Sequence, residues 1–358
     1  MKLLYLINFA GGSGTEKYVR LLMENYRQQG HTCILVYSQG GPLSLWAGKN
    51  DFATWQLNMD RRHAAAAGIK LAGYCRENSV ELIHAQYPRE NLIALMAKKI
   101  AGTPVVFTGH LTIRQGFFWQ RINRLLSPAD NAVIAVCAAA KKTMAQNGIP
   151  PEKITVIPNG TDVPQQHRIE RRDKTIRFIT LARLAPEKGL ETLVEACGML
   201  RNQCKVPFCC HIFGEGELSD LLQRQIEEKN LENVVQCPGK TPEPLEELRK
   251  SDVFVSPSLN NEALSFAALE AMSLGLPLVM TDVGAGRELT EQCGTLVPPG
   301  DAPALCQAMR RLAESEALRC EYGERAIQNA AKKYSLKNML TKTMDLYLSA
   351  CNQKEKRV

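Results

Sequence analysis

Residues 251–288 read SDVFVSPSLNNEALSFAALEAMSLGLPLVMTDVGAGRE, and this stretch decides the fold. An apolar strand is expected over Val253–Ser256, followed by a polar turn. A helix that carries Glu262 and Glu270 comes next and ends before Gly-Leu-Pro, which is a helix stop signal. A second apolar strand is expected over Leu278–Thr281. Strand, helix and strand within about forty residues indicate one βαβ unit of a parallel sheet.

The turn before this helix is expected to bind an anion. In open α/β folds ligands dock at the carboxyl ends of parallel strands. We expect the backbone amides of four residues to be unpaired at the helix start, where amides bind phosphate; these are Ala263, Leu264, Ser265 and Phe266. With Glu262 and Glu270 available to bind hydroxyl groups, the stretch predicts a site for a nucleotide-sugar.

The same alternation of strands and helices runs along the rest of the chain and predicts parallel sheets covered by helices. Between residues 162 and 174 the apolar pattern is lost, which indicates a linker. A chain of 358 residues is also too long for one growing core, so two doubly wound domains are expected. The other expected strands are Leu3–Asn8, Cys33–Tyr37, Leu82–Ala85, Val105–Thr108, Ala132–Val136, Thr155–Ile157, Arg177–Leu181, Cys209–Phe213 and Val234–Gln236.

Composition favours a cytoplasmic enzyme. The twelve cysteines contain no C-x-x-C pair, which favours a reducing compartment. The apolar run in the first residues, MKLLYLINFAGG, is too short for a secretory signal, and this segment is interpreted as a strand. No run approaches the roughly 18 apolar residues that a spanning helix needs.

The net charge of +7 is unevenly distributed. Residues 1–165 contain 18 Lys and Arg against 10 Asp and Glu, whereas the remainder contains 26 against 27. The excess indicates that the first half faces an anionic partner. No nucleic-acid-binding motif is present. Anionic lipid head groups or an acidic acceptor are therefore favoured over nucleic acid.

Two cations follow the expected strand Arg177–Leu181. Arg183 and Lys188 flank Pro-Glu, which suits the first turn of a helix, and cations at that positive end need an anion nearby. A diphosphate fits, because arginine offers a planar fork and lysine a point charge. The alternative, two solvated surface charges, stays open at this point.

The loop Gly-Gly-Ser-Gly at 11–14 follows the first strand and opens a helix, so a ligand can approach its backbone. Lys17 stands where a dinucleotide fingerprint has its third glycine, which argues against NAD. Glu16 either complements the helix dipole or belongs to the site. His110 ends a strand at the ligand-binding edge, although a single histidine is more often structural, as His84 is expected to be.

Glu262 and Glu270 do not fit a glycosidase. On one continuous helix, eight residues rise about 12 Å and rotate about 80° off a common face. Hydrolytic carboxylate pairs lie roughly 5 to 9.5 Å apart. The pair is better suited to holding two parts of one long ligand. No D-x-D cluster for a divalent metal is present, nor a P-loop, G-x-S-x-G or H-E-x-x-H motif.

The segment from Arg114 to Leu126 interleaves arginines with Phe117, Phe118 and Trp119. Such a pattern is typical of a helix at a membrane interface. The favoured interpretation, however, is a helix that packs these aromatic side chains on the sheet.

Taken in order, a series of short motifs resembles the retaining glycosyltransferases of family 4, which have the two-domain GT-B fold. The resemblance implies two Rossmann-like domains that face each other across a cleft, residues 1–165 and 166–334, with a helix over 335–358 that packs back on the first. The motifs are Gly-Thr-Glu at 14–16, His110, Val-Ile-Pro-Asn-Gly-Thr-Asp at 156–162, Arg183-Leu184 with Glu187-Lys188-Gly189, Gly214-Glu215-Gly216, Pro257-Ser258, Glu262 with Glu270, Gly275-Leu276-Pro277 and Val297-Pro298-Pro299-Gly300-Asp301.

The resemblance implies roles for the matching positions. Arg183 and Lys188 would bind the donor diphosphate and stabilise the leaving nucleoside diphosphate. Glu262 would contact the transferred sugar and Glu270 the ribose. His110 would touch the sugar from the other domain. Where the family has glycine, this chain has Ser13 and Ala263.

The remaining expected contacts come from backbone and from the first domain. Donor contacts are expected from Gly12, Gly14 and Gly214, and acceptor-side contacts from Glu16 and Arg114. The expected reaction is transfer of a sugar from a UDP-sugar to an acceptor hydroxyl, with retention and without a metal ion or cofactor. We expect it in cell-surface polysaccharide or glycolipid synthesis, in the cytoplasm with peripheral contact to the inner face of the plasma membrane. The alternatives are a UDP-sugar epimerase of the same fold and a non-catalytic nucleotide-sugar-binding subunit.

Overall fold

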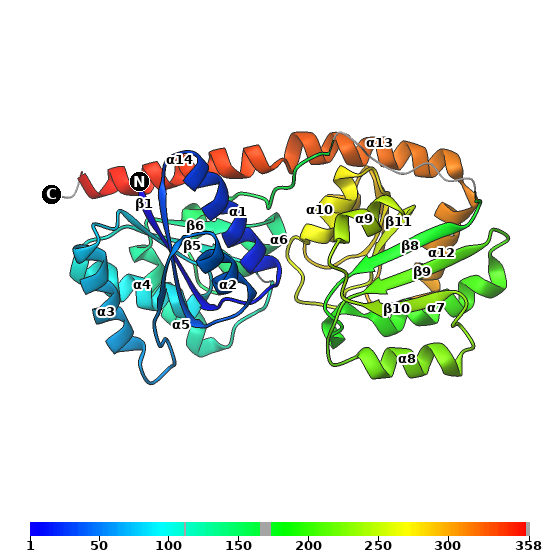
Figure 1. Ribbon diagram of the computed structural model, residues 1–358, viewed down its shortest axis with the longest axis horizontal. Coiled ribbons are helices and arrows are strands. Elements are labelled where there is room, and N and C mark those ends of the chain that lie inside the picture. Colours follow the sequence, from blue (N-terminus) through cyan, green and yellow to red (C-terminus); the bar gives the residue numbers. More distant parts are fainter. Residues whose placement is uncertain (111, 165–172, 356–358) are drawn as a thin grey trace. The chain divides into compact units, whose positions relative to one another are not determined.

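The computed structural model describes residues 1–110, 112–164 and 173–355, and the chain divides into two compact units. The first unit comprises Met1–Asn159 and Met339–Val358, and the second is Gly160–Asn338. The predicted linker at 162–174 lies partly outside the described residues. Figure 1 labels the helices and strands of both units.

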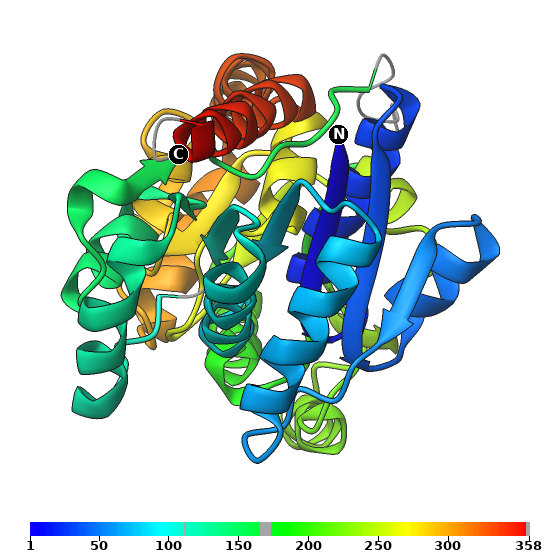
Figure 2. The ribbon, with the colours of Figure 1, turned by 90° about the vertical axis from the view of Figure 1, so that its left-hand side faces the viewer.

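The first unit is built on a seven-stranded parallel sheet with the order β3-β2-β1-β4-β5-β6-β7. Helices cover both faces of this sheet, so its central strands are buried along most of their length (Figure 2). The strands are β1 (Lys2–Phe9), β2 (Thr32–Gln39), β3 (Ala53–Gln56), β4 (Leu82–Ala85), β5 (Val105–Gly109), β6 (Ala132–Ala135) and β7 (Ile154–Val156). The helices are α1 (Gly14–Gln28), α2 (Pro42–Lys49), α3 (Ala64–Glu77), α4 (Pro88–Ala101), α5 (Phe117–Leu126), α6 (Ala138–Gln146) and most of α14 (Leu336–Glu355).

The second unit contains a six-stranded parallel sheet with the order β10-β9-β8-β11-β12-β13. The short 3₁₀ turn η3 (Pro186–Lys188) follows its first strand. The strands are β8 (Ile176–Leu181), β9 (Phe208–Phe213), β10 (Val235–Gly239), β11 (Val253–Ser256), β12 (Leu278–Thr281) and β13 (Gly294–Val297). The helices are α7 (Leu190–Gln203), α8 (Ser219–Glu228), α9 (Pro244–Arg249), α10 (Phe266–Ser273), α11 (Gly286–Thr290), α12 (Ala302–Glu314) and α13 (Glu316–Lys333).

Both units are Rossmann-like, as predicted, and in both the strand order reverses in the middle of the sheet. The reversal lies between β1 and β4 in the first unit and between β8 and β11 in the second. The connections leave in opposite directions there, so this is where α/β sheets bind ligands. The expected residues at 11–14, 183–188 and 257–262 follow strands next to these two points.

The elements that the sequence did not predict include two strands, β3 and β13, and helix α2. Strand β3 lies at the edge of the sheet and three of its four residues are exposed, so it has no apolar run. Strand β13 is also an edge strand and begins at a glycine. Helix α2 begins at a proline and has only two buried residues. Each of these elements forms because of its tertiary contacts, since its own sequence has no clear apolar pattern.

Helix α5 corrects a favoured interpretation. All ten of its residues are described, and none of them is buried. The expected packing of its aromatic side chains on the sheet is wrong for Phe117 and Phe118, which are 71% and 64% exposed. Trp119, Ile122 and Leu126 are half-buried, and Asn123 adds a hydrogen bond to the carbonyl oxygen of Asn147 at 2.9 Å.

Helix α14 contributes its later residues to the first unit. Tyr347 is fully buried, and its ring lies 5.9 Å from the ring of Tyr26. Its hydroxyl lies 2.5 Å from Nδ1 of His84, while the hydroxyl of Tyr26 donates to the carbonyl oxygen of Leu340 at 2.8 Å. The last helix is therefore part of the core of the first unit.

Candidate functional site

Lys188 and Glu262 meet at the carboxyl edge of the sheet in the second unit. Lys188 ends the turn after β8, Glu262 lies in the turn after β11, and these strands are neighbours. Nζ of Lys188 lies 2.5 Å from Oε2 of Glu262, and both side chains are mostly buried. Ser258 also donates from its hydroxyl to Oε2 of Glu262, at 3.2 Å. The structure thus brings together two of the predicted site residues.

Glu262 is not on a helix, contrary to the expectation. Helix α10 begins only at Phe266, and its N-cap Ser265 accepts a hydrogen bond from the amide of Ala268 at 3.4 Å. Asn261 has a φ of +56°, in the left-handed region, which is incompatible with an α-helix at that point. The helix therefore starts later than predicted. Glu262, Ala263 and Leu264 form the turn before it, and Glu270 alone is helical.

The loop after β12 fixes this turn. The amide of Ala285 donates to the carbonyl oxygen of Ala263 at 2.7 Å. Gly284 has a φ of +57°, and a Cβ atom there would collide with the carbonyl oxygen of Glu262. Glycine is thus required on two counts, conformation and space. The position of Glu262 is set by backbone contacts from a neighbouring loop.

Arg183 is oriented differently from Lys188. Its side chain is 66% exposed, and Nη2 donates to Oε1 of Glu187. The backbone of Glu187 in turn accepts from the amide of Leu259 at 2.8 Å, which ties η3 to the turn after β11. In this structure the arginine is therefore a solvent-facing charge at the edge of the site, and the lysine is the cation at the turn.

The two other predicted positions in the second unit lie near the same strand ends. Glu270 is buried on α10, with 8% of its surface exposed. Gly214 follows β9, and a Cβ atom there would collide with the carbonyl oxygen of Ala182, just after β8. The glycine therefore lets two strand-end loops approach each other closely.

In the first unit the Gly-rich loop is closed by Glu16. Oε2 of Glu16 accepts from the backbone amide of Ser13 at 2.9 Å and also from its hydroxyl. Glu16 is 5% exposed and lies in the first turn of α1, so it caps the helix. Gly14 is the first residue of α1, and Gly12 lies in the loop before it, where a Cβ atom would be 3.6 Å from Pro42. Gly12 therefore has room for a side chain, unlike Gly284.

His110 lies at the end of β5 within a buried polar network. Nε2 of His110 is 2.9 Å from Oε1 of Gln86, whose Nε2 donates to the carbonyl oxygen of His84 at 3.3 Å. This amide orientation makes Nε2 of His110 the donor, so its Nδ1 is the acceptor nitrogen. Burial lowers the pKa of His110 to about 3, which keeps the ring neutral at pH 7. Gln86 was missed, although it directly follows the predicted strand Leu82–Ala85.

His84 is structural, as expected. Its Nε2 lies 2.6 Å from the hydroxyl oxygen of Thr108, and Tyr347 binds its other nitrogen. Burial, and to a smaller extent the nearby His110, lower the pKa of His84 to about 3.

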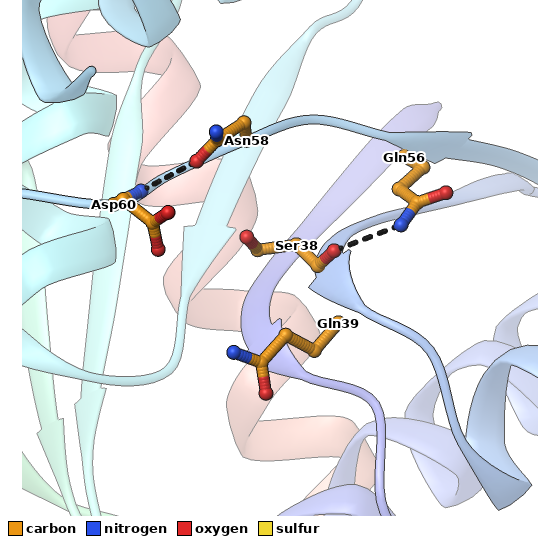
Figure 3. Close-up of a pocket in the computed structure, with 5 residues that line it drawn as sticks. All are labelled: Ser38, Gln39, Gln56, Asn58 and Asp60. Atoms are coloured by element: carbon orange, nitrogen blue, oxygen red, sulfur yellow. Dashed lines mark hydrogen bonds between the residues drawn. The ribbon is translucent and has the colours of Figure 1, made fainter.

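A polar pocket of about 410 Å³ lies where β2 and β3 end. Figure 3 shows the amide of Gln56 donating to the carbonyl oxygen of Ser38 at 3.1 Å, and the backbone amide of Asp60 donating to the side-chain oxygen of Asn58 at 2.9 Å. Sequence reasoning missed this pocket because β3 was not predicted. The lining residues are Ser38, Gln39, Gln56, Asn58 and Asp60. Arg114, the other predicted acceptor-side residue, is exposed just before α5.

Within the described part of the chain, no group of three or more His, Cys, Asp or Glu side chains could hold a metal ion. Among the same residues, none of the helices combines the length and the apolar character needed to cross a bilayer. None of the twelve cysteines, all of which lie in the described residues, forms a disulfide bond.

Two family models match the chain and together span most of it. Residues 12–165 match the model described as Glycosyltransferase Family 4, and residues 162–333 match the model described as Glycosyl transferases group 1. The boundary between the two matches falls at the predicted linker.

Two curated relatives match about half of the chain. The amylovoran biosynthesis glycosyltransferase AmsK of Erwinia amylovora is 35% identical over 184 residues, which cover 48% of this chain and 44% of that protein. The putative colanic acid biosynthesis glycosyltransferase WcaL of Salmonella typhimurium is 36% identical over 197 residues, or 52% and 48% of the two chains. The matched stretch thus covers about half of the length of these relatives.

Among solved structures, Anabaena HepE in complex with UDP superposes with a TM-score of 0.85. The match covers 98% of this chain and 100% of that chain, at 21% identity. This likeness shows that the two chains share a fold.

Proposed function

Because the chain belongs to the GT-B glycosyltransferases of the family 4 type, we propose that it transfers a sugar from a nucleoside diphosphate-sugar to an acceptor hydroxyl, with retention. The observation that carries the proposal is the Lys188–Glu262 contact at the strand edge of the second unit. The cation there matches the phosphate end of a sugar-phosphate bond, and the carboxylate beside it matches the sugar end.

The donor is proposed to bind with its diphosphate at Lys188. Arg183 is exposed and forms an ion pair with Glu187 in its own segment, so a rotation of its side chain is enough to add a second cation. The backbone at the start of α10 adds the positive end of a helix. We propose UDP as the nucleotide, supported by the solved complexes of HepE with UDP and with UDP-glucose.

The proposed reaction breaks the bond between the anomeric carbon and an oxygen of the β-phosphate. The acceptor oxygen forms the new bond on the same face of the sugar, and its proton passes to the departing phosphate oxygen. Lys188 and Arg183 stabilise the charge on the leaving diphosphate, the role that electrostatic preorganisation has in most enzymes. With these two cations, we propose that no metal ion is needed. Neutral His110 is proposed to accept a hydrogen bond from a sugar hydroxyl at Nδ1.

The acceptor is proposed to be a glycan. The relatives AmsK and WcaL carry names from the biosynthesis of amylovoran and colanic acid, which supports a role in polysaccharide synthesis. The pocket at Ser38–Asp60 presents amide, hydroxyl and carboxylate groups, and these bind sugar hydroxyls well. The twelve cysteines form no disulfide bonds among the described residues, which fits a reducing compartment, so we place the reaction at the cytoplasmic face of a membrane.

The test is incubation of the purified chain with UDP-sugars, first alone and then with glycan acceptors. We expect slow release of UDP from one donor in water, faster release with an acceptor, and the same activity in EDTA. NMR of the product should show the anomeric configuration of the donor. An isomerised UDP-sugar in the absence of acceptor would indicate the epimerase instead, and no turnover of any donor would leave only a binding subunit.

A further inference from the structure

Helix α5 exposes three large apolar side chains, those of Phe117, Phe118 and Leu125. A surface helix of a globular domain normally turns its apolar face to the core and its polar face to water. In α5 the side that faces the unit is mixed: Trp119, Ile122 and Leu126 are half-buried there, and Asn123 donates to the carbonyl oxygen of Asn147 at 2.9 Å. Phe118 and Leu125, seven positions apart and thus on one face, are 64% and 78% exposed.

Positive charge surrounds this exposed apolar face. Arg121 and Arg124 are exposed on the same helix, and the guanidinium of Arg121 lies 4.9 Å from the centre of the Phe117 ring. Residues 112–129 contain no aspartate or glutamate. The face therefore offers aromatic and aliphatic side chains together with two arginines, on a segment without acidic residues.

We propose that α5 is a docking surface for an anionic lipid bilayer. Phe117, Phe118 and Leu125 enter the boundary between head groups and acyl chains, and Arg121 and Arg124 bind lipid phosphates. An interfacial helix combines these two properties, and the positive charge selects anionic lipid. The charge complementarity favours a bilayer over a second copy of this chain, because two identical faces would bring their arginines together.

The proposal does not depend on the transfer reaction. It rests on the exposed face of α5, whereas the proposed donor site lies in the second unit. Binding to lipid and release of UDP from the donor can therefore be measured separately.

The test is sedimentation of the full chain with vesicles of phosphatidylcholine, alone or mixed with phosphatidylglycerol. We expect binding to the mixed vesicles only, weakened by salt. The double variant R121Q/R124Q should bind about 25-fold more weakly, since each basic side chain near an anionic surface contributes about fivefold. The double variant F118S/L125S should also lose binding, by at least about tenfold. The matched control is I69S/K70Q on α3, where Ile69 is 63% exposed, and it should bind like the wild-type chain.

Because all four α5 side chains are exposed, the variants should fold with an unchanged melting temperature and release UDP from the donor at the wild-type rate in the absence of vesicles. Equal binding by wild-type chain and variants, or no preference for anionic lipid, overturns the proposal. A wild-type dimer in solution that F118S/L125S makes monomeric, with no vesicle binding, also overturns it and identifies the face as an interface between copies.

Discussion

Lys188 Nζ lies 2.5 Å from Oε2 of Glu262, although 74 positions separate the two residues in the chain. Glu262 is also held by Ser258, whose own carbonyl oxygen accepts from the hydroxyl of Thr281 at 2.5 Å. The lysine is therefore directed by a carboxylate that β11, β12 and their loops keep in place. A cation held in this way loses little side-chain entropy when a phosphate arrives, which is the basis of preorganisation.

Replacing Lys188 by alanine should abolish most of the transfer. The loss of a charged group that stabilises the leaving diphosphate should reduce kcat about 10²- to 10³-fold, by analogy with removal of one oxyanion donor. Initial rates of UDP release with acceptor measure the effect. The control is Lys250→Ala, which removes another ion-paired lysine of the second unit, the partner of Glu247, and should leave the rate unchanged. Near-normal turnover of Lys188→Ala would refute the role.

Replacing Gly284 by alanine should displace Glu262. The substitution forces a side chain into a left-handed backbone and against the carbonyl oxygen of Glu262, so it should lower the free energy of unfolding by more than about 1–3 kcal/mol and also reduce kcat. Gly239→Ala is the matched control, because Gly239 has a φ of +84° but open space around its Cβ position. In this control the free energy of unfolding should fall only by the cost of the left-handed backbone conformation. Equal melting temperatures and equal activities of the two variants would contradict the prediction.

The buried histidines should make the protein less stable in acid. The pKa of His84 is about 3 in the folded protein, below its value of about 6.5 in an unfolded chain, so the unfolded state binds more protons between these pH values. Stability from this residue is complete above pH 6.5 and is lost as the pH falls. Lowering the pH from 6.5 to 5 should cost about 2 kcal/mol for His84. Urea unfolding at both pH values should show a smaller pH dependence in His84→Gln, and an unchanged dependence would show that the ring is not buried in its neutral form.

Removing the hydroxyl group of Tyr347 should destabilise the protein without changing its fold. Tyr347→Phe leaves Nδ1 of His84 without its partner in a buried site, which should cost about 1–3 kcal/mol. The comparison is Tyr322→Phe, since Tyr322 is only partly buried, at the edge of the core of the second unit. Thermal unfolding of the two variants measures the difference, and the prediction fails if both melt together.

The polar pocket of the first unit should affect the acceptor and not the donor. Asp60→Ala removes a carboxylate from the lining and should raise the KM for the acceptor several-fold, while UDP release without acceptor stays the same. Glu77→Ala, an exposed acidic residue on α3, is the control and should change neither. A change in donor hydrolysis with Asp60→Ala would place this residue outside the acceptor site.

The sequence alone predicted the strands that consist mainly of apolar residues. Strands β11 and β12 match their predicted bounds to the residue, because short apolar runs between turn residues leave no other choice. Edge strands such as β3 carry exposed residues, and their presence depends on a neighbouring strand that the local sequence does not reveal.

The sequence predicted which residues belong to the site better than it predicted how they are arranged. Lys188 and Glu262 were expected to share one ligand, and the structure brings them together. The helix start was wrong because Asn261 adopts a left-handed conformation, and that choice depends on the packing of the loop around Gly284. The contact of Gln86 with His110 needs β4 and β5 to be neighbours, a fact of topology rather than of local sequence.

The fully buried Tyr347 on α14 also has a consequence for how the chain is synthesised. The first unit needs residues from Met339 onward, so its interior stays incomplete until the ribosome has made this segment. The second unit is a continuous segment and can fold while translation continues. Although most of the first unit precedes the second in the chain, it is completed later, and a chain that stops before Met339 exposes an unfilled apolar interior to chaperones and proteases.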